Sequence, residues 1–101
     1  MLHMIVNTHN AESCAFRGNE EEQALTSAFD LFGEKAGERG ITLHGSWVSR
    51  AAHEVFVLAD APNAHVIEEL LLGVGLVGRS HTRVLPVVST DDAMDVAEPA
   101  A

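Results

Sequence analysis

The sequence contains one cysteine, few basic residues and no long apolar run, and each shortage excludes a class of protein. Because Cys14 is the only cysteine, no intrachain disulfide can form and nothing indicates an oxidising compartment. Six Lys and Arg against fifteen Asp and Glu give a formal net charge of −9, which should repel nucleic acid and anionic membranes. The longest apolar stretch, around Leu70 to Val77, is interrupted by two glycines, so no membrane span is expected. We therefore expect a cytoplasmic protein that binds neither nucleic acid nor membrane.

The length of 101 residues fits one domain with a core of its own. Apolar residues make up 47% of the chain and charged residues 21%, which is typical of globular proteins. Acidic residues gather near the C-terminus, where Asp91, Asp92, Asp95 and Glu98 lie. We expect a domain over residues 1–90 and an acidic C-terminal tail, a frayed terminus, over residues 91–101.

Apolar and polar residues alternate over residues 2–9, which predicts a strand with two unlike faces. The face that we expect to contact the helices carries Leu2, Met4 and Val6. The opposite face carries His3, Ile5, Asn7 and His9.

A helix is predicted from Asn19, a suitable N-cap, to Gly40, which would end it. Its apolar residues recur at helical spacing, at Leu25, Ala28, Phe29, Phe32 and Ala36. Residues 41–49 and 54–60 then resemble two strands of a hairpin, and the second of them is apolar on both faces.

The second half of the chain repeats the order of helix and strand. Asn63 is a plausible N-cap for a helix that would bury Ile67, Leu70, Leu71 and Val74. A last strand, Ser80 to Val88, contains Pro86, which suits the edge of a sheet.

This order of elements predicts an α+β, ferredoxin-like βαββαβ fold. Right-handed crossovers give a four-stranded antiparallel sheet in the order 4-1-3-2, with two helices on one face. The other face is too apolar to meet only water, since we expect it to carry Ile5, Phe56, Leu85 and Val87. A homodimer that buries this face is the simpler expectation.

Four segments resemble a known superfamily. They are Met4 to His9, Gly40 to Trp47, His53 to Asp60, and Arg83 to Val87 with the following acidic residues. Through them the chain resembles the dimeric α/β-barrel superfamily and is similar to GYD-type and related small bacterial proteins. The resemblance implies a barrel-like dimer. It leaves function open, because the superfamily includes monooxygenases, isomerases, haem enzymes and ligand-sensing domains.

The predicted topology brings three histidines and the cysteine to one end of the sheet. Strand one should be antiparallel to strands three and four, so its end lies beside the starts of both. A metal site is therefore predicted from His9, Cys14, His53 and His81. We expect His9, His81 and Arg83 to share the uncovered face.

Imidazole and thiolate together suit zinc, copper or iron. The alternative is that these histidines are exposed or hydrogen-bonded without any ligand. His44 and His65 are assigned to that second group, and His3 to a frayed terminus.

Two functions remain open. The first is a protein that binds a transition metal or a small ligand, with Asn7, His9, Trp47 and Arg83 lining the ligand site. The alternative is a cofactor-independent monooxygenase or isomerase for a small aromatic or activated-carbonyl substrate. In that enzyme His9 or His81 would be the general base, and Trp47 and Arg83 would position the substrate.

Overall fold

A computed structural model describes residues 1–9, 20–76 and 80–97, without the side chains of residues 20–25 and 96–97. The element order is β1 (Leu2–Thr8), α1 (Glu20–Ala36), a 3₁₀ turn η1 (Gly37–Arg39), β2 (Thr42–Ser49), β3 (Glu54–Asp60), α2 (Ala64–Gly73), β4 (His81–Pro86) and α3 (Thr90–Ala97). None of the helices in this part of the chain is long and apolar enough to cross a membrane.

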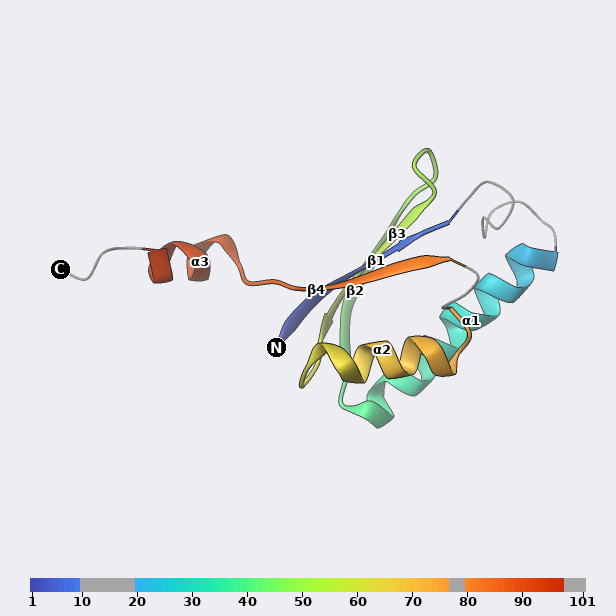
Figure 1. The fold of residues 1–101 in the computed structure, drawn as a ribbon, viewed down its shortest axis with the longest axis horizontal. Helices are drawn as coiled ribbons and strands as arrows, with labels where there is room; N and C mark the ends of the chain where they lie inside the picture. The colour runs from blue at the N-terminus through green and yellow to red at the C-terminus, as the bar shows by residue number, and fades with distance from the viewer. Residues whose placement is uncertain (10–19, 77–79, 98–101) are drawn as a thin grey trace.

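The four strands form one antiparallel sheet in the order β2-β3-β1-β4, which confirms the predicted fold. Both α1 and α2 lie on the same side of this sheet (Figure 1). β1 and β3 occupy the centre, and β4, which contains Pro86, is an edge strand as expected.

Local signals in the sequence set the ends of the helices. Gly40 adopts φ +72° and its N–H donates to the carbonyl oxygen of Gly37, so a left-handed glycine ends the first helical segment as predicted. Asn63 caps α2, because its Oδ1 accepts a hydrogen bond from the N–H of Val66 at 3.0 Å. The expected cap at Asn19 lies outside the described residues.

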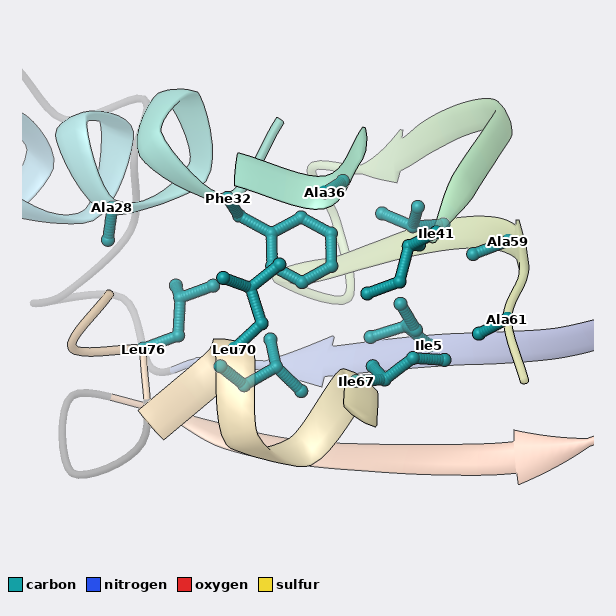
Figure 2. Packing of buried hydrophobic residues seen from close by; sticks show 12 residues of the cluster. Ile5, Ala28, Phe32, Ala36, Ile41, Ala59, Ala61, Ile67, Leu70 and Leu76 are labelled. Atoms are coloured by element: carbon teal, nitrogen blue, oxygen red, sulfur yellow. The ribbon is translucent and has the colours of Figure 1, made fainter. Parts of the chain in front are cut away.

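The core fills the space between the helices and the sheet (Figure 2). Phe32 of α1 and Leu70 of α2 pack against Ile5 of β1, and all three are almost fully buried. Alanines at positions 28, 36, 59 and 61 are buried among these larger residues. Small side chains there allow close approach of the helices to the sheet.

The predicted faces of β1 are reversed in the structure. Ile5 lies in the core beneath the helices, and His3, Asn7 and His9 are buried with it. Leu2 and Met4 therefore belong to the face without helices, which we call the open face. The prediction failed because it assigned the more apolar set to the core, whereas the polar set is held there by hydrogen bonds. For the same reason Ile5 cannot belong to a dimer interface.

Two other expectations about the termini were wrong. His3 is fully buried rather than frayed, and its Nδ1 lies 2.9 Å from the carbonyl oxygen of Met1. Residues 90–97 form the helix α3, which projects away from the sheet (Figure 1). Ser89 helps to start this helix, since its Oγ accepts a hydrogen bond from the N–H of Asp92.

Candidate metal site

Two histidine side chains meet at the end of the central strand pair. The N–H of His9 donates to the carbonyl oxygen of His53 at 3.1 Å, so the pairing of β1 with β3 continues one residue beyond Thr8 and Glu54. The two imidazole rings are 5.8 Å apart between centroids, and their planes make an angle of 70°. Nε2 of His9 and Nδ1 of His53 are both buried and have no hydrogen-bond partner among the described residues.

Asn7 fixes the tautomer of His9 through a chain of hydrogen bonds. The Ser80 hydroxyl donates to the carbonyl oxygen of Leu76 at 2.9 Å, so Ser80 Oγ can only accept from Asn7. Nδ2 of Asn7 therefore faces Ser80 at 2.6 Å and Thr82 Oγ1 at 3.0 Å. The amide oxygen of Asn7 then faces Nδ1 of His9 at 3.2 Å.

An amide oxygen can only accept a hydrogen bond, so Nδ1 of His9 must carry the ring proton. Nε2 consequently holds a free lone pair when the ring is neutral. Burial lowers the pKa of the His9 imidazole below its ordinary value, and the charge of the neighbouring His53 lowers it further. A lowered pKa favours the neutral ring, which is the form whose lone pair can bind a metal ion.

His53 adopts a backbone conformation that is rare for residues other than glycine, with φ +53°. It is the last residue of the turn between β2 and β3, and its N–H donates to the carbonyl oxygen of Arg50 at 3.4 Å. Asparagine, aspartate and histidine enter the left-handed region more readily than other non-glycine residues. This conformation places the His53 ring beside His9.

His81 does not join this pair. The pairing of Thr8 with His81 and of Asn7 with Thr82 places His81 on the open face, opposite to His9. The prediction that His9 and His81 share a face was therefore wrong, because the faces of β1 had been reversed. The register does place His81 opposite Thr8, next to His9 in the chain and at the same end of the sheet.

The remaining predicted residues are also dispersed. Trp47 and Arg83 lie in one row across the open face, with Phe56 and Val6 between them. Three strand spacings separate them by about 14 Å, too far to hold one small substrate within a single chain. Cys14 lies outside the described residues. Among the residues that are described, no group of three or more His, Cys, Asp or Glu side chains could hold a metal ion.

Ser80 and Thr82, which position Asn7, were missed by the sequence analysis. The available signal was the register, because antiparallel pairing at this end of β4 places Thr82 opposite Asn7. Ser80, just before β4, and Thr82, within it, are two residues apart, so both hydroxyl groups can reach the Asn7 amide.

Comparison with known families covers the whole chain. Residues 1–101 match the family described as "Domain of unknown function (DUF3303)". The chain belongs to this DUF3303 family. No curated protein sequence matches it.

Two solved structures are similar to this DUF3303 chain. SCO4226 from Streptomyces coelicolor A3(2) is 13% identical, with a TM-score of 0.46, and the match covers 88% of this chain and 100% of that one. A chain of the MjSpt4:Spt5 complex is 16% identical, with a TM-score of 0.43, and the match covers 99% of this chain and 60% of that one. At these values neither structure says anything about the chemistry of the DUF3303 chain.

Proposed function

We propose that this protein binds a divalent transition-metal ion between Nε2 of His9 and Nδ1 of His53. The observation that carries the proposal is the pair of buried, unpartnered imidazole nitrogens, one of which is fixed as a lone-pair donor by Asn7. A buried polar atom without a partner costs about 1–3 kcal/mol, so two of them side by side call for a ligand. Imidazole nitrogens suit zinc, copper, nickel and iron.

The spacing of the rings is compatible with one shared ion. A metal–nitrogen bond of about 2.0–2.1 Å and a ring radius of about 1.1 Å put the ion about 3.2 Å from each centroid. At a tetrahedral angle the centroids would then be about 5.2 Å apart. The observed 5.8 Å requires only a small side-chain movement or a wider angle at the metal.

The surroundings of the pair also favour a cation. A metal-binding histidine normally donates its second ring N–H to a neighbouring acceptor, as His9 does to Asn7. The lowered pKa of His9 keeps its lone pair available below the pH at which an ordinary histidine would be protonated. The net charge of −9 attracts cations to the whole molecule.

Two protein ligands leave coordination positions for water, a small molecule or a further side chain. Cys14, five residues after His9 in the sequence, is the predicted third ligand. His81 takes no part in this proposal, because it lies on the open face.

We further propose that the protein is a homodimer that buries its open face. This face carries apolar side chains in every strand, Leu2, Met4, Phe56, Leu58, Trp47 and Leu85 among them. Large contiguous apolar surfaces are uncommon on monomers. The helix α3 is a second argument for a partner chain. An isolated helix of eight residues has little stability in water, so packing against a partner would stabilise it. The likeness to GYD-type proteins within the dimeric α/β-barrel superfamily likewise remains a prediction.

The alternative of a cofactor-independent monooxygenase or isomerase finds less support. Its proposed base His9 and its positioning residues Trp47 and Arg83 lie on opposite faces of the sheet. Of the two candidate bases, His81 is the one that shares the open face with Trp47 and Arg83.

The experiment is a Zn²⁺ titration of untagged, chelator-treated protein, in which binding is measured by calorimetry. We expect one ion per chain for the natural sequence, and strongly reduced binding for His53→Asn. Asparagine also tolerates the left-handed backbone, so this variant should keep its fold. His65→Gln is the matched control, because the His65 side chain is 86% exposed on α2.

Equal Zn²⁺ affinity in the natural protein and the His53→Asn variant would refute the site. A separate titration of Cys14→Ser decides whether the thiolate is the third ligand. Loss of binding in that variant supports the predicted His and Cys site. Unchanged binding means that water or an added ligand, and not the thiolate, completes the coordination of the ion by the two histidines.

A further inference from the structure

A second site lies between α1 and the edge strand β2, and neither His9 nor His53 lines it. A groove of about 740 Å³ opens there, which is within the usual size range of ligand sites. Its helix wall consists of Thr26, Phe29, Asp30, Phe32 and Gly33. Its strand wall consists of Leu43 to Val48, with Val55 and Val57 of β3 behind it.

The strand wall is unusual because six consecutive residues of β2 line the groove. Successive side chains of a strand point to opposite faces, so a cleft on one face would be lined by every second residue. Every residue of this segment therefore contributes backbone or side-chain atoms to the groove. Among the described strands β2 pairs with β3 alone, so its outer edge can offer backbone N–H and C=O groups to a further strand.

The helix wall is shaped to leave room beside this edge. Thr26, Phe29, Asp30 and Gly33 follow the i, i+3, i+4, i+7 spacing of one helix face. Gly33 lacks a side chain, and a Cβ placed there would meet no atom within 4 Å. The groove therefore has a slot next to Gly33 that can accept a side chain from a bound molecule.

The charges of the groove indicate what it accepts. Among the described lining residues the only ionisable side chains are those of Asp30 and His44. Asp30 is exposed, and the chain as a whole carries a net charge of −9. One exposed carboxylate beside apolar walls, on an acidic protein, fits a ligand with apolar groups and a basic group.

We propose that this groove binds an extended, basic peptide segment as an added strand on the edge of β2. Main-chain hydrogen bonds to the β2 edge would supply affinity. Apolar side chains at alternate positions would enter the space between Phe29 and Val48, and a basic side chain would pair with Asp30. The site is independent of the metal proposal. It lies between α1 and β2, and only its rim at Trp47 belongs to the open face.

The probes are three capped hexapeptides with lysine at alternate positions and valine, leucine or phenylalanine at the others. Trp47 lines the groove and is the only tryptophan, and the chain contains no tyrosine, so its fluorescence reports binding directly. Amide chemical shifts of ¹⁵N-labelled protein locate the contact. We expect saturable binding by at least one of these peptides, with the largest shifts in β2 and in the Gly33 turn of α1.

Two variants with matched controls test the two walls. Gly33→Leu should abolish binding by filling the slot, whereas Gly37→Leu should not. Gly37 lies one turn further along, outside the groove, and a Cβ there also meets no atom within 4 Å. Asp30→Asn should weaken binding several-fold, while Asp91→Asn on α3 makes the same change of charge without effect.

A peptide that is N-methylated at alternate residues cannot pair with the edge strand, and it should not bind. If it binds as tightly as its parent, the groove takes an apolar cation rather than a strand, and the proposal is wrong. It is equally wrong if none of the three peptides binds, or if Gly33→Leu binds normally. A last measurement follows the amide chemical shifts of β2 as the protein is concentrated without peptide. If these shifts change and Gly33→Leu abolishes the change, the groove binds a second copy of the chain, and the peptide proposal is wrong.

Discussion

The link from Asn7 to His9 can be tested by replacing Asn7 with leucine, which has a similar size. Asn7 is 1% exposed and makes hydrogen bonds to His9, Ser80 and Thr82. Its loss leaves the ring N–H of His9 without an acceptor, which should destabilise the fold by about 1–3 kcal/mol. The His9 ring also loses its fixed orientation and tautomer, and changes of this kind reduce metal affinity about 10–100-fold.

The assay compares Zn²⁺ affinity, measured by calorimetry, with thermal unfolding of the same samples. Thr82→Val is the graded control, because it removes one acceptor of the Asn7 amide and keeps the bond from His9 to Asn7. We expect a smaller loss of affinity in this control. The ¹⁵N shifts of the His9 imidazole report the tautomer independently of any variant. A ring protonated on Nε2 in the natural protein, or unchanged affinity in a folded Asn7→Leu variant, would refute the reasoning.

Three further predictions concern the core, the open face and pH. Leu71→Ala should cost about 2–5 kcal/mol by chemical denaturation, whereas Leu72→Ala, at a site 63% exposed, should change stability little. Leu85→Asp should dissociate the proposed dimer in sedimentation experiments, while Leu72→Asp should not; a dimer that survives Leu85→Asp would contradict the interface. His9 has a lowered pKa in the folded chain, so the stability of metal-free protein should be highest above the unfolded pKa of about 6.5 and fall as pH drops through the folded pKa. A His9→Gln variant should lose part of this dependence, and an unchanged pH profile would contradict it.

The strand order could be predicted from the sequence because it depends on coarse properties. The spacing of apolar residues in α1, the cap at Asn63 and the proline in β4 each specify one element, and the handedness of crossovers then leaves one arrangement. These signals are local, and each is strong enough to survive small errors in the position of an element.

The faces of β1 could not be predicted in the same way, because a shift of one residue exchanges them. Leu2, Met4 and Val6 are the more uniformly apolar set, so composition favoured their burial under the helices. The structure instead buries Asn7 there, where hydroxyls from β4 satisfy its amide. That compensation comes from residues more than seventy positions away and is invisible along β1 alone. The groove beside β2 was missed for a related reason, since it depends on how α1 is placed over the edge strand.

His3 and His9 show why an unpartnered nitrogen is not sufficient to identify a site. Both rings are buried on the same face of β1, and both leave Nε2 without a hydrogen bond. The difference is the neighbour, because only His9 has a second imidazole beside it. His3→Leu should therefore keep or raise stability, since it removes an unsatisfied polar atom and the carbonyl oxygen of Met1 keeps its bond from Ala61. Zn²⁺ binding should be unchanged in this variant, whereas His9→Leu should abolish it. His9→Leu should also lower stability by about 1–3 kcal/mol, because the buried amide oxygen of Asn7 loses its donor. If His3→Leu weakened Zn²⁺ binding as much as His9→Leu, the ion would depend on burial of polar groups along β1 rather than on the pair formed by His9 and His53.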